Sequence, residues 1–136
     1  MFEIFEHTAD VGLRVRAADL DELFAEAGRG LFSLLVENIE NAQAESTDRI
    51  ALEADSLEDL FHDWLSDLLY YFDRWHRVLC RFSVRVRDRK VEAVVAGEEF
   101  DPSKHRTGPE IKAITYHLLA VRKIQDGWEA EVIVDI

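Results

Sequence analysis

The sequence predicts an α+β fold in a single domain over residues 1–136, with a mostly antiparallel sheet covered by two helices. Two segments space their apolar residues by three and four, as amphipathic helices do. The other regular segments alternate apolar and polar residues, as strands do, and most follow one another through short turns. Such turns favour antiparallel pairing, and a chain of 136 residues that is 48% hydrophobic can form one core.

The first half of the chain predicts two strands, a helix and a third strand. Residues 2–6 and 11–17 alternate apolar with polar side chains, which is the strand pattern. From residue 20 to 35 the spacing becomes helical, and Asp19 can cap this helix at its amino end. The strand pattern returns at residues 48–54.

The second half predicts a long helix followed by strands. Ser56 can cap a helix over residues 57–75, whose wide apolar face belongs to the core. The pair Asp126–Gly127 predicts a hairpin between the last two strands. The element order is therefore ββαβαββββ, in which the last four strands are RFSVRVR, KVEAVVAGEEF, EIKAITYHLLAVRKI and GWEAEVIVDI.

The charge of the chain argues against several classes of function. Lys and Arg number 16 against 28 Asp and Glu, which gives a formal net charge of −12. So negative a surface repels nucleic-acid backbones and anionic membranes, and we expect no direct sequence-specific nucleic-acid binding and no membrane partner. Arg81, Arg85 and Arg87 share one strand face and could contact RNA, but pairing with neighbouring acids is the favoured interpretation.

The amino terminus and the cysteine content predict a cytoplasmic protein. MFEIFEHTAD has neither the basic region nor the apolar region of a secretory signal. The longest apolar run is much shorter than the ~20 residues that cross a bilayer. The single cysteine, Cys80, leaves no internal disulfide to form.

Two polar stretches could carry chemistry. In EHTAD, residues 6–10, His7 and Asp10 lie in a turn where side chains can converge, although an Asx or ST turn at Thr8 and Asp10 is favoured from this stretch alone. The segment 97–112 is a polar loop, which by composition alone is an ordinary solvated loop. Its candidate site residues are Asp101, Lys104, His105, Glu110 and Lys112.

The carboxyl terminus is a third candidate. Asp10 and Asp135 both lie off the apolar faces of their strands. If the first and last parts of the chain are neighbours in the sheet, Asp10, Asp135 and the carboxylate of Ile136 could converge, and three anions so close would repel one another. A divalent cation would resolve that conflict. Oxygen ligands without a thiolate favour Ca²⁺, Mg²⁺ or Mn²⁺ over Zn²⁺.

Four motifs in a fixed order resemble the archease family, and together they cover essentially the whole chain. They are HTAD near the amino terminus, DWLSDLLYYFD in the middle, GEEFDPSKH followed by EIKAITYH, and GWEAEVIVDI at the end. Two departures stand out: Glu99 replaces a frequent proline, and DLLYYFD replaces a more usual ELLY run. Neither departure touches the proposed metal ligands.

The resemblance implies a small cytosolic protein cofactor of an RtcB-type RNA ligase, the enzyme that joins tRNA halves after intron removal. Such a protein is no enzyme itself and promotes guanylylation and multiple turnover of the ligase. Members of the family hold a divalent cation, assigned as calcium. By motif match, the metal ligands would be Asp10, Asp135 and Ile136. Candidates for the partner-facing surface are His7, Lys104, His105 and Lys112.

Two other functions stay open. The family resemblance also allows a chaperone-like or adaptor protein that has no metal-dependent role. An independent metal-dependent phosphohydrolase is less favoured, because no nucleophile or general base stands beside the proposed ligands.

Overall fold

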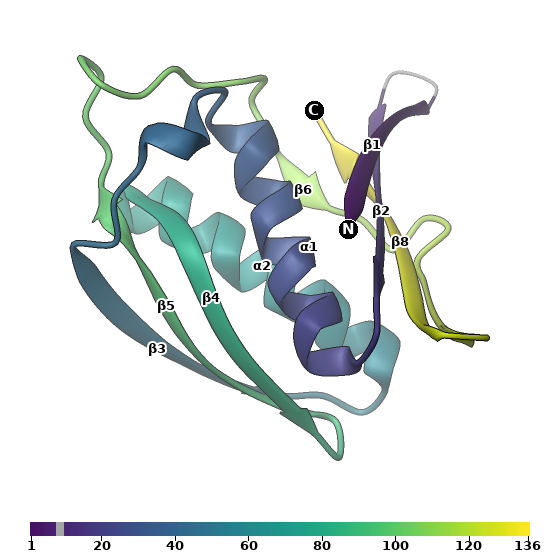
Figure 1. Ribbon diagram of the computed structural model, residues 1–136. Helices are drawn as coiled ribbons and strands as arrows, with labels where there is room; N and C mark the ends of the chain where they lie inside the picture. Colours follow the sequence, from purple (N-terminus) through teal and green to yellow (C-terminus); the bar gives the residue numbers. More distant parts are fainter. Residues whose placement is uncertain (8–9) are drawn as a thin grey trace.

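A computed structural model of the chain, which describes residues 1–7 and 10–136, arranges the elements in three layers. Two antiparallel sheets lie on the outside and two helices lie between them (Figure 1). The predicted α+β class is confirmed. The strands, however, divide between two sheets, which the sequence pattern did not separate.

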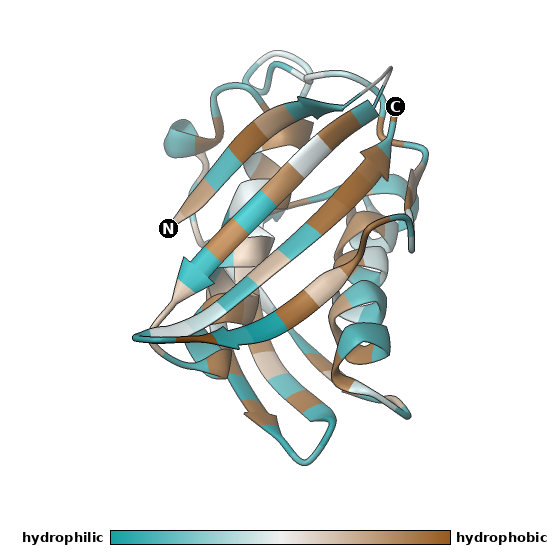
Figure 2. Ribbon diagram, turned by 90° about the vertical axis from the view of Figure 1, so that its right-hand side faces the viewer, coloured by the Kyte–Doolittle hydropathy of each residue, from teal (hydrophilic) through white to brown (hydrophobic). Residues whose placement is uncertain are grey.

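The first sheet contains both ends of the chain and has the order β1-β2-β8-β6, with β7 also pairing to β8. Its strands are β1 (Phe2–His7), β2 (Asp10–Ala17), β6 (Ala113–Ile114), β7 (Ala120–Ile124) and β8 (Gly127–Asp135). Hydrophobic and hydrophilic residues alternate along β1, β2 and β8 (Figure 2), so one face of the sheet packs on the helices and the other faces outward. The first and last parts of the chain are thus neighbours, which meets the condition on which the convergence of Asp10 and Asp135 depended.

The second sheet has the order β3-β5-β4. Its strands are β3 (Ser46–Glu53), β4 (Arg77–Arg87) and β5 (Lys90–Glu99). The register between β4 and β5 shifts between Leu79 and Arg81, which places a bulge at Cys80. Cys80 is accordingly half-buried.

The two helices match their predicted limits. In α1 (Leu20–Leu35), the carboxylate of Asp19 accepts a hydrogen bond from the Glu22 amide at 2.9 Å. In α2 (Leu57–Trp75), the hydroxyl of Ser56 accepts one from the Asp59 amide at 3.1 Å. A short 3-10 helix, η1 (Ile39–Asn41), follows α1. No helix in the described part of the chain has the length and hydrophobicity to cross a membrane.

The core lies between the sheets and is built on both helices. Trp64 of α2 is fully buried, and its indole nitrogen donates a hydrogen bond to the carbonyl of Phe24 in α1 at 2.9 Å. This bond satisfies the polar atom of the largest buried side chain and ties the two helices together. The apolar stripes of both helices are core, as the sequence predicted.

The predicted strand over residues 110–124 was wrong as a single element. Two short strands replace it, because β6 and β7 pair with β8 in registers that differ by three residues. The extra residues form a loop over 115–119, in which Leu118 has a φ of 56°. The hydroxyl of Thr115 donates to the carbonyl of Ile133 at 2.8 Å and holds the start of this loop on β8.

Gly97 allows the close approach of β4 at the bulge, and we expect Gly97→Ala to destabilise the fold by about 2 kcal/mol. A Cβ at this position would lie 1.9 Å from the carbonyl oxygen of Val78, a main-chain atom that cannot turn away. Gly12→Ala is the matched control, because the atoms nearest to the added methyl group belong to the ring of Phe5, a side chain that can rotate. Urea denaturation of both variants measures the difference, and equal losses would contradict the assignment.

Candidate functional site

The register of the first sheet brings Asp10 and Asp135 side by side. Val11 lies opposite Val134, so one further step along both strands sets Asp10 opposite Asp135. Both side chains belong to the outward face, because Asp10 has the parity of Arg14 and Asp135 has the parity of Glu131. The sequence left the proximity of these two carboxylates conditional, and the strand pairing supplies the condition.

His7 extends the same row onto the next strand. In the β1–β2 pairing His7 lies opposite Asp10, and directly opposite residues share a face of the sheet. The Nδ1 atom of His7 is buried and has no hydrogen-bond partner among the described residues. The His7 ring also meets the ring of His117 edge-on, with 5.4 Å between the centroids. Thr8, the other residue of the alternative turn interpretation, lies outside the described residues.

Lys112 and the carboxyl terminus complete this edge of the sheet. The amide of Lys112 donates to the carbonyl of Asp135 at 2.7 Å, and Ala113 pairs with Asp135. One further step of that register sets Lys112 opposite Ile136. Five of the seven residues predicted for the site therefore lie in two adjacent rows at one edge of one sheet. They are His7, Asp10, Lys112, Asp135 and Ile136.

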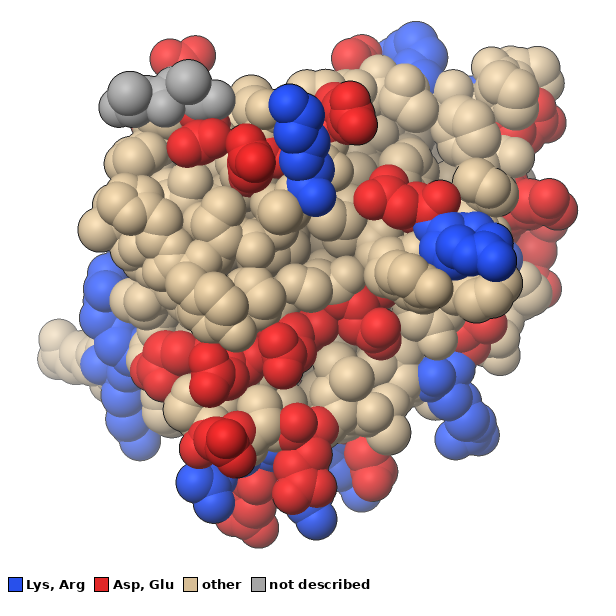
Figure 3. Space-filling view, turned by 180° about the vertical axis from the view of Figure 1, so that it is seen from behind, with Lys and Arg blue, Asp and Glu red and all other residues tan. Residues whose placement is uncertain are grey.

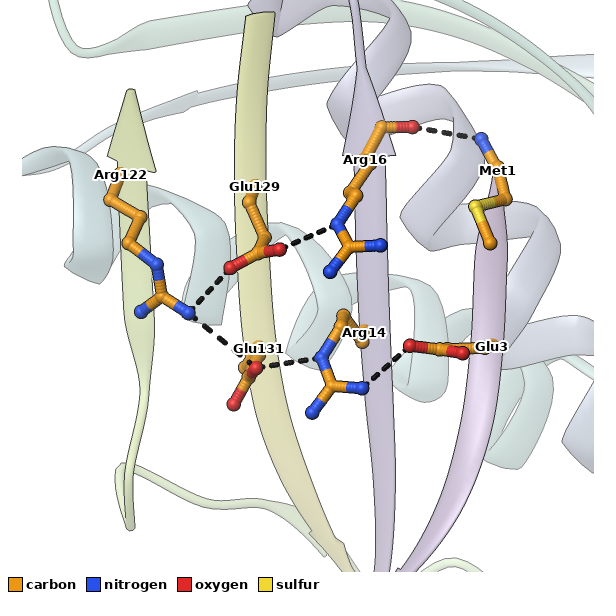
Figure 4. A network of polar contacts seen from close by, with 7 residues as sticks. All are labelled: Met1, Glu3, Arg14, Arg16, Arg122, Glu129 and Glu131. Atoms are coloured by element: carbon orange, nitrogen blue, oxygen red, sulfur yellow. Dashed lines mark hydrogen bonds and ion pairs between the residues drawn. The ribbon is translucent and has the colours of Figure 1, made fainter. Parts of the chain in front are cut away.

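The remaining acids of the outward face are held by arginines (Figure 4). Arg14 donates to Glu3 at 2.6 Å and to Glu131 at 2.7 Å, and so bridges three strands. Glu129 is paired with Arg16 and Arg122. The hydrogen bond from Arg16 lowers the pKa of Glu129 in spite of the burial of that side chain.

Asp10 and Asp135 differ from these paired acids. No lysine or arginine of the described chain forms an ion pair with either of them, whereas Glu131, four residues before Asp135 on the same strand, accepts from Arg14. A carboxylate without a cationic partner is free to bind a cation from solution. The end of the outward face near the carboxyl terminus is therefore its available acidic part.

The donors at this edge fit a hard divalent cation only with help from the main chain. Within residues 1–7 and 10–136, no three side chains of His, Cys, Asp or Glu gather as a metal-binding group. Asp10 and Asp135 supply two carboxylates, and Ile136 would supply a main-chain oxygen as a third donor. Ca²⁺ accepts such mixtures of carboxylate, main-chain oxygen and water. The residues present fit a cation of this kind better than Zn²⁺, which prefers nitrogen and sulfur ligands.

Lys104 and His105 lie elsewhere, in a buried ion-pair network on the second sheet. The Nε2 atom of His105 is 2.7 Å from Glu98, and its Nδ1 atom accepts from the Asp101 amide. Lys104 donates to Glu98 at 2.8 Å. His105 is only 4% exposed, so its place in the partner-facing surface is corrected: its hydrogen bonds with Glu98 and the Asp101 amide hold it inside the protein, where it anchors the loop after β5.

The loop over 115–119, which the sequence pattern did not predict, contacts His7 through His117 and so borders the row of Asp10 and Asp135, here called the carboxylate row. Tyr116 is 56% exposed and Leu118 is 60% exposed. The Tyr116 ring stacks on His62 at 3.9 Å, so the loop presents it in a fixed orientation. One signal was present in the sequence: the apolar positions change parity between Leu118 and Leu119, which a continuous strand would not do.

Comparison with known proteins relates the whole chain to one family. Residues 2–136 match the model of the Archease protein family (MTH1598/TM1083). The protein archease of Methanosarcina acetivorans is 36% identical over 140 residues, which cover 99% of this chain and 95% of that protein. The protein archease of Pyrococcus abyssi is 34% identical and is covered over 98% of its length.

Solved structures have the same fold. The solution structure of protein 1598 of Methanobacterium thermoautotrophicum has a TM-score of 0.82 and 26% identity, with 99% of this chain and 98% of that one covered. A crystal structure from Thermotoga maritima, described as an archease and possible chaperone, has a TM-score of 0.67 and 22% identity, with 100% and 98% covered. At that identity the second likeness shows the fold alone.

Proposed function

This chain belongs to the archease family, and on that basis we propose that it is a protein cofactor of an RtcB-type RNA ligase in tRNA splicing or RNA repair. In this proposal it promotes guanylylation and multiple turnover of the ligase and has no ligase activity of its own. It acts in the cytoplasm and binds a divalent cation, Ca²⁺, Mn²⁺ or Mg²⁺, through Asp10, Asp135 and Ile136.

One observation supports this function more than the others. Two acidic side chains that have no arginine or lysine partner among the described residues face outward on neighbouring strands, next to the last residue of the chain. The other acids of that face are neutralised by arginines. Placing two carboxylates in register without a counter-ion has an electrostatic cost, which a bound cation would remove.

The chain's own residues would do the positioning. The ladder of β2 and β8 fixes the distance between Asp10 and Asp135, since both lie in a hydrogen-bonded sheet and not on a free loop. Lys112 lies just before β6, bonded through its amide to Asp135, and its exposed side chain adds a positive charge that can meet a phosphate group. A cation bound at this edge supplies further positive charge, which stabilises phosphates during nucleotide transfer.

A chaperone-like or adaptor function without a metal is the second candidate. Large apolar side chains that face water favour it, because unfolded or partly folded proteins bind to such surfaces. They include Tyr70, Trp75, Tyr116 and Leu118.

Ligation assays with a purified RtcB-type ligase test the proposed function. We expect no ligation by this protein alone, little effect on a single turnover, and many more turnovers per ligase when the protein is added. A cognate ligase that is not stimulated in the presence of Mn²⁺ or Ca²⁺ would contradict the proposal. Suppression of client aggregation in that case would support the chaperone function instead.

The loop over 115–119 is expected to contact the ligase. Aromatic and aliphatic side chains that are fixed and exposed act as anchors in protein interfaces. We expect the double variant Tyr116→Ala and Leu118→Asn to raise the concentration for half-maximal stimulation about tenfold and to leave cation affinity unchanged. Asparagine tolerates the left-handed backbone of Leu118, so the variant removes only the apolar side chain.

The matched control for this loop is the double variant Tyr70→Ala and Trp75→Ala. These residues of α2 are 51% and 52% exposed, close to the values for the loop. Titration of each double variant into the ligase assay measures the effect. An equal loss from both would show that general hydrophobicity, and not this loop, supports stimulation.

A further inference from the structure

The outward face of the second sheet is basic, although the chain carries a net charge of −12. β4 contains four arginines and no acidic residue. Side chains of the three strands alternate between the helices and the solvent, and the exposed charged side chains on the solvent side are five cations and two acids. The cations are Arg49, Arg81, Arg85, Arg87 and Lys90, and the acids are Glu53 and Glu92. Acidic side chains gather instead on the face seen from behind (Figure 3).

Most of these arginines have no acidic partner. Arg87 pairs with Asp21 at 2.9 Å, as the sequence analysis expected. Arg81 and Arg85 were expected to pair as well, and that was wrong: neither they nor Arg49 form an ion pair with any residue that the structure describes. Glu92 lies opposite Arg85 in the ladder without bonding to it. Near Arg81, Glu40 and Glu45 line the same hollow and offset part of its charge.

The surface between these arginines is hollowed. A hollow of about 740 Å³ is lined by three arginines, two acids and small or aliphatic side chains. The arginines are Arg49, Arg85 and Arg87, and the acids are Glu92 and Asp21, the partner of Arg87. The ladder explains this shape, since Val94 lies between Arg49 and Ser83, and Glu92 lies between Ala51 and Arg85. Three long cationic side chains thus stand around a hollow that also contains the carboxylate of Glu92.

We propose that this face binds the phosphodiester backbone of RNA without reading its sequence. Guanidinium groups bind phosphate oxygens in pairs, and they are weakly hydrated, so they release water readily. Arg85 and Arg87 are successive side chains on one face of β4, where the spacing is about 6.6–6.8 Å, and Arg81 lies on the same face one position beyond Ser83. This spacing lets separate arginines reach separate phosphates of one chain.

The composition of the face favours RNA over an acidic protein. Protein interfaces rely on large apolar anchors. The large hydrophobic residues that are exposed on the described chain all lie outside β3, β4 and β5; they are Met1, Ile4, Tyr70, Trp75, Tyr116 and Leu118. The same absence leaves no aromatic platform for stacked bases, so binding would depend on backbone phosphates alone.

This inference goes beyond activation of a ligase, and it is tested without one. The basic face and the carboxylate row lie on opposite outer layers of the molecule (Figure 1). One layer can therefore contact RNA while the other contacts a protein. The net negative charge of the whole chain weakens the binding, and we expect a Kd no tighter than about 10⁻⁶ M, as for non-specific complexes.

The experiment measures binding of a fluorescent tRNA transcript by anisotropy from about 20 to about 200 mM salt. The test variant is Arg49→Gln, Arg81→Gln and Arg85→Gln. The control variant is Arg74→Gln, Arg106→Gln and Lys123→Gln, which removes the same charge from other exposed positions. We expect the test variant to bind about tenfold more weakly and to have a salt slope smaller by about two to three. We expect the control to stay within about twofold of the native protein.

Three outcomes would overturn the proposal. The first is no RNA binding by the native protein at the lowest salt. The second is an equal loss from both triple variants, since that would show a response to net charge and not to this face. The third is displacement of RNA by polyglutamate at equal charge concentration, which would assign the face to an acidic protein partner.

Discussion

Glu98→Ala is expected to lower the free energy of unfolding by about 3 kcal/mol at neutral pH. Glu98 is 5% exposed. Its Oε1 atom accepts a hydrogen bond from Lys104 at 2.8 Å, and its Oε2 atom lies 2.7 Å from the Nε2 atom of His105. The Nδ1 atom of His105 accepts the amide of Asp101, so in the neutral ring the proton is on Nε2 and points at Glu98. Removing the carboxylate leaves that donor buried without an acceptor.

The effect of Glu98→Ala should depend on pH. Burial opposes the charged form of Glu98, but hydrogen bonds from Lys104 and His105 outweigh it and hold the pKa below the ordinary value of 4.5. A carboxylate whose pKa is lower in the folded state stabilises the fold above its unfolded pKa. That stabilisation is lost as the pH falls through the folded pKa. The difference in the free energy of unfolding between the native protein and the variant is therefore largest near pH 7 and shrinks below pH 4.5.

Urea denaturation at several pH values measures this prediction, and Glu99→Ala is its control. Glu99 is the next residue on the same strand, carries the same charge and is exposed. A surface change of this kind is expected to stay within about 0.5 kcal/mol. A similar small loss from both variants would mean that the buried network adds nothing to stability.

The helices and their caps could be predicted because their signals are local. Asp19 and Ser56 accept the expected amides, and the apolar stripes are buried. The separation into two sheets is not a local property. A strand pattern shows which side chains share a face but not which strand lies beside it, so β3 and β5 gave no sign that they pair away from β2 and β8.

The candidate site was likewise predictable where its signals are local and not where they depend on other elements. Parity placed Asp10 and Asp135 off the apolar faces of their strands, and the β2–β8 register then brought them together. The burial of His105 could not be read from its polar surroundings, because it depends on Glu98, a residue of another element that satisfies it. The unpaired arginines of β4 were not predicted, because the net charge of the chain was taken to mean that acidic residues lie near every arginine. β4 itself contains no acidic residue.

Asp10→Asn is expected to weaken cation binding at least about tenfold and to abolish stimulation of the ligase. Oxygen-ligand sites lose affinity as the number of charged ligands falls. Asparagine keeps the shape of the side chain and removes only its charge, so the fold should be retained. Calorimetric titration of Ca²⁺ and Mn²⁺ measures the loss independently of any ligase.

The control for Asp10→Asn is Glu6→Gln. Glu6 lies in the same hairpin and is exposed, and it points to the other side of β1 from His7. The substitution Glu6→Gln removes the same charge as Asp10→Asn, from nearly the same position. We expect its cation affinity to change less than about twofold, because charges in water interact weakly at such sites. Equal effects of Asp10→Asn and Glu6→Gln would show a diffuse attraction and no site.

Asp135→Asn extends this prediction to the pair. If Asp10 and Asp135 hold one cation, each single variant already removes most of the binding, and the double variant should lose little more. Residues that act on a shared partner are coupled in this way, whereas independent residues have additive effects. The register of β2 and β8 places the two carboxylates opposite each other, so coupling is the expected result. Strictly additive losses would mean that the two aspartates bind separate ions or none, and the shared site would have to be abandoned.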